Sequence, residues 1–198
     1  MKIVAALFAA LFSTMCGASF SVEDSIDCSR SATEAERRIE ACNRQIDAIG
    51  PGGATLAWRG EAKEALGDLS GAQRDYEESL ALAPELGGTL LGLGRVHLAQ
   101  GDLASARRYL DRAIAENDSG IARDLLGSYA LRQHDYPQAL SWYEELLARE
   151  VDDPIGLYGR GLARLGMGDD DGREDIALAR AEWDRVDAHF GSHGLAAP

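Results

Sequence analysis

Apolar residues recur along most of this chain at the three- and four-residue spacing of amphipathic helices, and short polar turns interrupt them regularly. The clearest segment covers residues 56–84, where two helical patterns flank the turn Gly67-Asp68. A related segment follows 34 residues later, at 90–118, and two more copies lie at about 127–147 and 157–180. The pattern therefore predicts an all-α chain built from pairs of helices.

Small residues mark equivalent points in the four copies. Glycine recurs in the first predicted helix with spacings of 34, 33 and 34 residues, at Gly60, Gly94, Gly127 and Gly161. The second helix carries Ala72, Ala106, Ala139 and Arg173 in step, and the turns are Gly67-Asp68, Gly101-Asp102, His134-Asp135 and Gly168-Asp169. Small side chains let two helices cross closely, a turn glycine accepts left-handed backbone, and the aspartate after it suits a helix N-cap. A fixed period of about 34 residues predicts a solenoid, because neither helix of a pair can bury its apolar stripe alone.

In this register the chain resembles the tetratricopeptide repeat. The first copy matches that pattern at Gly60, Gly67, Ala72, Tyr76 and Pro84, and the four copies cover about residues 53–180. The later copies depart from it at single positions: Asp118 replaces the closing proline, His134 a turn glycine, and Arg173 and Ala177 the usual alanine and aromatic. The resemblance implies an all-α tetratricopeptide-repeat superhelix, which is an α-solenoid of antiparallel helix pairs.

The resemblance also implies an organisation of the whole chain. Residues 19–52 form an N-terminal segment, whose helical pattern from Thr33 to Ile49 resembles the second helix of a degenerate half repeat. Residues 53–190 hold four repeats, and 191–198 are a tail. The repeats end in a long capping helix from about Asp171 to Phe190, whose expected apolar face is Ile176, Leu178, Trp183, Val186 and Phe190.

The first residues have the pattern of an export signal. Lys2 precedes an apolar run from Ile3 to Phe12, and small residues follow up to Ala18. This predicts a signal peptide of residues 1–18 and a bacterial protein that is periplasmic or secreted, without membrane insertion after cleavage. A lipid attached to Cys16 is the alternative.

Two cysteines, Cys28 and Cys42, remain after the predicted cleavage. An oxidising compartment favours a disulfide between them, which would fasten the end of the solenoid where half a repeat lacks a neighbour. The alternative is two unpaired thiols, with Cys42 as a small core residue. Their spacing does not fit a CxxC redox site, and no companion ligands suggest zinc.

Candidate catalytic and metal sites are weak. His189 and His193 have the four-residue spacing of metal ligands on a helix, but Gly191 between them makes a continuous helix doubtful. Asp169-Asp170-Asp171 lacks the alternating ligands of a calcium loop, and no nucleophile or acid–base set stands out. The net charge of −13 disfavours nucleic acid as a partner. We therefore expect no catalytic residues, no metal site and no cofactor.

The family resemblance implies that the first helices line a concave groove that receives a protein or peptide. Transferred repeat by repeat, the groove positions are Ala57, Glu61, Glu64, Leu91, Arg95, Asp124, Ser128, Arg132, Tyr158 and Leu162. Some of these residues are expected to pack between repeats instead. Arg95, Asp124, Arg132 and Tyr158 are expected to contribute to binding and little to folding.

The sequence thus predicts a non-catalytic interaction module or scaffold that binds a peptide or partner protein. One alternative is a structural subunit or accessory lipoprotein of an envelope assembly machine. A small enzyme on helices is a second alternative and is disfavoured.

Overall fold

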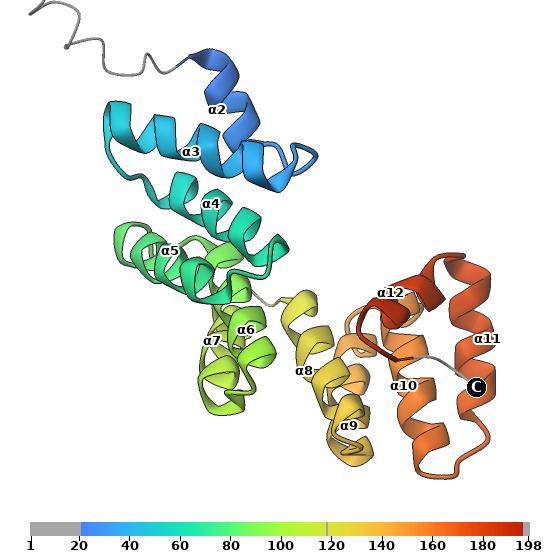
Figure 1. Cartoon of the computed structure of the whole chain (residues 1–198). Helices are drawn as coiled ribbons and strands as arrows, with labels where there is room; N and C mark the ends of the chain where they lie inside the picture. Colours follow the sequence, from blue (N-terminus) through green and yellow to red (C-terminus); the bar gives the residue numbers. More distant parts are fainter. Residues whose placement is uncertain (1–20, 118, 196–198) are drawn as a thin grey trace, which may run out of the picture. The chain divides into compact units, whose positions relative to one another are not determined.

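The computed structural model describes residues 21–117 and 119–195, in which every regular element is a helix (Figure 1). The predicted all-α class is confirmed. The predicted signal peptide, residues 1–18, lies outside the described residues. The chain divides into two compact units, Met1–Val96 and His97–Pro198.

The first unit is a stack of helices joined by short turns. Its helices are α2 (Val22–Ser29), α3 (Ala35–Ile49), α4 (Gly53–Ala65), α5 (Leu69–Leu82) and the part of α6 (Gly87–Gln100) that precedes the boundary. Helices α2, α3 and α4 each pack against the next helix along the chain. Helix α2 was not expected from the sequence, and with α3 it gives the N-terminal segment a complete helix pair.

The second unit continues the pairing. Its helices after the end of α6 are α7 (Leu103–Asn117), α8 (Gly120–Arg132), α9 (Tyr136–Leu147), α10 (Pro154–Gly166), α11 (Gly172–Glu182) and α12 (Val186–Ser192). The packed pairs include α7 with α8, α8 with α9, α9 with α10, and α10 with α11.

The single long capping helix expected over residues 171–190 is wrong. Helix α11 ends at Glu182, because Trp183 takes an extended backbone conformation with φ −144° and ψ 107°. The chain then turns, and α12 contacts both α10 and α11. Of the expected apolar face, Leu178 is 49% exposed, whereas Val186 and Phe190 are fully buried in the core of this unit.

A buried tyrosine accounts for two of the four recurring glycines, Gly60 and Gly127, whereas Gly161 packs against Gly172 and Ile176 of α11. A Cβ built on Gly60 would lie 2.9 Å from the Tyr76 ring, and one on Gly92 would lie 2.5 Å from it. Tyr143 is enclosed in the same way by two glycines of its own unit, Gly127 and Gly159. The ring of the second helix therefore packs directly on the backbone of the first helices on either side.

The turns between paired helices have the predicted chemistry. The residues before the aspartates all have positive φ: Gly67 at 79°, Gly101 at 78°, His134 at 58° and Gly168 at 84°. The carboxylates of Asp68, Asp102 and Asp135 accept backbone N–H groups of the following helices, at 2.9, 3.1 and 3.3 Å. The fourth turn departs from this pattern, since Asp171 precedes α11 without a side-chain cap bond.

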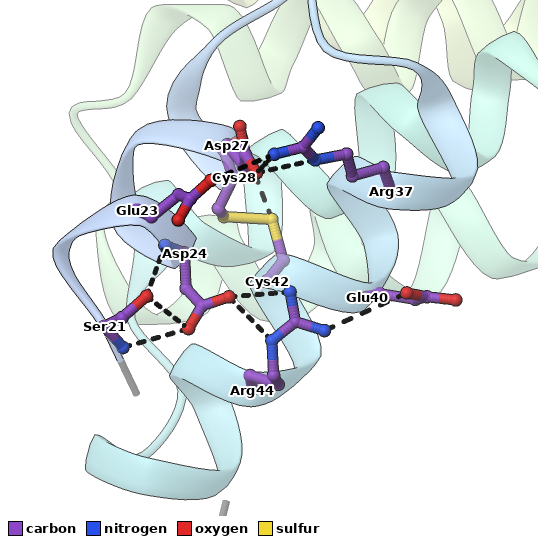
Figure 2. Close-up of polar contacts among 9 residues, drawn as sticks. All are labelled: Ser21, Glu23, Asp24, Asp27, Cys28, Arg37, Glu40, Cys42 and Arg44. Atoms are coloured by element: carbon purple, nitrogen blue, oxygen red, sulfur yellow. Dashed lines mark hydrogen bonds and ion pairs between the residues drawn. A yellow bond between two sulfur atoms is a disulfide. The ribbon is translucent and has the colours of Figure 1, made fainter. Parts of the chain in front are cut away.

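The predicted disulfide between Cys28 and Cys42 is confirmed, and it joins α2 to α3 (Figure 2). Both cysteines are fully buried. Arg44 of α3 reinforces the pair by donating to Asp24 of α2 at 2.6 Å, and Asp24 in turn accepts the backbone N–H of Ser21 at 2.9 Å. A covalent bond and a capped helix terminus thus fix α2 on α3.

Candidate functional site on the first helices

The first helix of each pair carries the residues predicted to line a groove, and we call that side of each unit the first-helix face. In the first unit it is formed by α4 and α6. The guanidinium of Arg95 donates to both carboxylate oxygens of Glu64, at 2.8 and 2.9 Å. The Tyr76 hydroxyl donates to the same carboxylate at 2.9 Å. Bidentate geometry and a third donor hold this ion pair in one orientation.

Burial and the neighbouring Glu64 carboxylate raise the pKa of Tyr76, so its hydroxyl stays protonated and remains a hydrogen-bond donor. The pair itself is partly accessible, since the Arg95 and Glu64 side chains are 33% and 19% exposed. These two groove predictions therefore lie together, on the face and within reach of solvent.

Glu61 continues this face toward the disulfide. Its side chain is 48% exposed and pairs with Arg38 at 2.7 Å, while the Arg38 Nε donates to the carbonyl oxygen of Cys28 at 2.9 Å. The predicted groove residues Ala57 and Leu91 are half-buried. The first-helix face of this unit is thus a mixed surface with two partly exposed carboxylates and one partly exposed arginine.

In the second unit, the predicted groove residues on α8 form a buried polar cluster. One carboxylate oxygen of Asp124, Oδ1, accepts from the Ser128 hydroxyl at 3.2 Å and from the Tyr143 hydroxyl at 3.3 Å. Asp124 and Ser128 are 5% and 3% exposed. Their prediction as accessible groove residues is wrong, because other side chains of this unit cover them.

The cover is α12. His189 places Nε2 3.0 Å from the other carboxylate oxygen of Asp124, and His193 places Nδ1 3.3 Å from the Ser128 hydroxyl. Phe190 stacks on Tyr158 of α10 with ring centroids 4.6 Å apart. The last helix therefore lies on the first-helix face of its own unit.

Tyr158 was predicted to bind a partner with little effect on folding, and this is also wrong. Its side chain is fully buried, and its hydroxyl donates to Asp187 of α12 at 2.5 Å. Two groove predictions in this unit remain accessible. Arg132 is exposed above the Tyr129 ring, at 5.7 Å from its centroid, and Leu162 lines an open hollow of about 300 Å³.

The pKa values of His189 and His193 are shifted in opposite directions. The hydrogen bond with Asp124 raises the pKa of His189, whereas burial lowers the pKa of His193. The doubt that Gly191 raised is removed, because α12 runs through Gly191 to Ser192. The four-residue spacing of His189 and His193 thus correctly placed both side chains on one side of α12. Nothing near them in the sequence indicated that Asp124 lies beside them.

Within residues 21–117 and 119–195, no helix has the length and apolar character that crossing a membrane requires.

Comparison with known proteins agrees with the helix-pair pattern. Two family profiles described as tetratricopeptide repeat match residues 64–128 and 125–186. Probable biofilm formation methyltransferases WspC of Pseudomonas aeruginosa and Pseudomonas putida are 37% and 33% identical over 73 and 82 residues. Those segments are 37% and 41% of this chain, and they span only 17% and 19% of the methyltransferases.

Solved structures show the same fold at low sequence identity. A crystal structure of MamA has a TM-score of 0.68 at 20% identity, covering 84% of this chain and 97% of MamA. MamA from Desulfovibrio magneticus has a TM-score of 0.66 at 16% identity, covering 84% and 98%. YrrB, described as a TPR protein with an unusual peptide-binding site, has a TM-score of 0.59 at 19% identity, covering 83% and 84%. The chain belongs to the tetratricopeptide repeat family.

Proposed function

We propose that this protein is a non-catalytic interaction scaffold that binds a peptide or a segment of a partner protein on the first-helix face of its first unit. Family membership supports a protein-interaction module in general, and YrrB is a relative in fold described as having a peptide-binding site. The observation that carries the proposed location is the partly exposed charged set formed by Glu61, Glu64 and Arg95.

The composition of this face indicates the chemistry of the ligand. The Glu61 side chain pairs with Arg38 but is still 48% exposed, more than Arg95 or Glu64, so its carboxylate is the charged group most accessible to a new partner. Ala57 and Leu91 add half-buried apolar surface beside these charges. With a net charge of −13 on the chain, a peptide that combines basic and small apolar residues fits best.

The disulfide supports a location in an oxidising compartment, since such bonds persist outside the reducing cytosol. Together with the predicted signal peptide, it favours a periplasmic or secreted scaffold. Mass spectrometry of the native protein tests this, because processing should leave an N-terminus near Ser19. Recovery of the intact chain from Met1 would refute export.

The binding proposal is tested by placing a photo-crosslinking residue at Glu61 of α4 or, as a matched control, at Glu77 of α5. Both positions are exposed glutamates of the same unit, but only Glu61 lies on the first-helix face. In cells of the source organism, position 61 should capture a partner and position 77 should not. In titrations with a peptide from that partner, Glu61→Gln should weaken binding several-fold and Glu77→Gln should not. Equal capture from both positions would refute the location.

A further inference from the structure

Three side chains with metal-binding atoms converge in the second unit. Asp124 comes from α8, His189 from α12, and His193 directly follows α12. One ligand atom from each lies within 4.8 Å of the other two. From these positions we infer that Asp124, His189 and His193 form a binding site for a divalent transition-metal ion of the zinc type.

The distances allow coordination after small side-chain rotations. In a tetrahedral site with bonds of about 2.0–2.1 Å, neighbouring ligand atoms lie about 3.3 Å apart. His189 Nε2 and Asp124 Oδ2 are already 3.0 Å apart. The rings of His189 and His193 lie 5.0 Å apart between centroids and are inclined at 67°, so the two imidazoles need not stack as they converge.

The donor set selects the class of ion. Two imidazoles and one carboxylate suit zinc and similar transition metals, whereas magnesium and calcium prefer sites made of oxygen ligands. Three protein ligands leave one position of a tetrahedral ion for water or an anion. One carboxylate and two neutral imidazoles would leave the complex with a single net positive charge.

The surroundings orient the carboxylate. The Ser128 and Tyr143 hydroxyls both donate to Oδ1 of Asp124, which leaves Oδ2 directed at His189. Such hydrogen bonds to a ligating carboxylate are a usual feature of protein metal sites. Asp124 is 5% exposed, so its position is set by the fold and is not that of a mobile surface acid.

The consequence is a metal-dependent connection between α12 and α8. The ion would add a coordination link to the contacts that already hold α12 on the first-helix face, such as the stacking of Phe190 on Tyr158. It would therefore stabilise α12 in the position that it has in this structure. This inference is independent of partner binding by the first unit.

The test is calorimetric titration of ZnCl2 into the full chain, purified without a histidine tag and freed of metal with a chelator. We expect one zinc ion per chain at this site and at least tenfold weaker binding by His193→Gln and by Asp124→Asn. His134→Asn is the matched control, because it removes an exposed histidine of the same unit and because asparagine tolerates the positive φ of 58°. Its affinity should stay within about twofold of the wild type.

Thermal melts give a second measurement. Zinc should raise the melting temperature of the wild type and of His134→Asn, and at the same concentration should raise that of His193→Gln by clearly less. Far-UV circular dichroism checks that the variants fold; if Asp124→Asn does not, His193→Gln decides, since that side chain is only half-buried at the end of the unit. Absence of zinc binding at millimolar concentration, or wild-type affinity in His193→Gln, would overturn the inference.

Discussion

The packing of Tyr76 against glycine leads to a prediction for two neighbouring positions of α6. Gly92 and Gly88 are one turn apart in this helix. A Cβ at Gly92 would lie 2.5 Å from the Tyr76 ring, whereas a Cβ at Gly88 would meet nothing within 4 Å. Replacing each with alanine therefore makes the same chemical change in a closed and in an open environment.

The magnitude follows from two opposing effects. Alanine restricts the unfolded chain more than glycine does, which stabilises the folded state by about 0.4–1 kcal/mol at both positions. At Gly92 the new methyl group also overpacks the core, at a cost of about 1–3 kcal/mol. Tyr76 cannot move aside freely, because it is 1% exposed and its hydroxyl is bonded to Glu64. Gly92→Ala should thus lose about 1–2 kcal/mol, and Gly88→Ala should gain up to about 1 kcal/mol.

Urea denaturation followed by circular dichroism at 222 nm measures both changes. The difference between the variants isolates overpacking, since the effect on the unfolded chain is common to the two. Tyr76→Leu provides a further check, because Gly92→Ala should cost less once the ring is gone. Equal stability of Gly88→Ala and Gly92→Ala in the wild-type background would refute the assignment of glycine to close packing on tyrosine.

Three other perturbations have expected outcomes. The Cys28–Cys42 disulfide joins residues 14 apart in sequence, so its reduction should lower the free energy of unfolding by about 3 kcal/mol in the chain-entropy description. The melting temperature should fall while most of the helicity remains. Two free thiols in the unreduced, denatured mature chain would contradict the bond. Tyr158→Ala should lower the free energy of unfolding by about 3–5 kcal/mol, because it empties a buried site, and Tyr158→Phe by only about 1 kcal/mol, because it removes one hydrogen bond. If denaturation shows near-wild-type stability for the alanine variant, the side chain of Tyr158 is accessible after all. Hydrogen bonds from the backbone N–H of Ser21 and from Arg44 lower the pKa of Asp24 below its ordinary 3.8. The ionised Asp24 side chain therefore contributes fully to folding stability above pH 3.8, and this contribution is lost as the pH falls through the lower pKa of the folded state. The stability difference between the wild type and Asp24→Asn should therefore shrink as the pH falls below 3.8, and a difference that does not change over that range would count against it.

Much of the fold could be predicted because each repeat contains the same local signals for helices, turns and N-caps, so the signals recur several times along the chain. The left-handed turn and the N-cap that follows it recur in register, and the structure has positive φ at Gly67, Gly101, His134 and Gly168. The His134 position is informative, since the period placed a turn there although histidine is an unusual residue for it. Helix α2 was missed because its sequence, VEDSIDCS, is short and polar, and its position depends on Cys42 and Arg44.

The candidate site was harder to predict, because a helical phase identifies one side of a helix without showing what covers that side. Glu64 and Arg95 share this phase and do lie together, at 2.8 Å. Asp124 and Tyr158 have the same phase, but they are buried under α12. The repeat pattern specifies contacts between neighbouring helices, whereas this cover comes from a segment beyond the last repeat.

After α11 the chain turns back onto α10, and this turn could not be predicted from the periodic spacing of apolar residues. Helix α11 ends where Trp183 becomes extended, and only then do Asp187 and Phe190 reach Tyr158. Continued as one helix, the segment would have kept its apolar residues on a single stripe for the end of the stack. The break instead directs Phe190 onto the first-helix face and places His189 65 residues in sequence from Asp124, its partner. Contacts between residues so far apart in sequence depend on how the whole unit packs. The return of α12 therefore explains both why the burial of Asp124 and Tyr158 was not predicted and why Asp124 was not recognised as a neighbour of the two histidines.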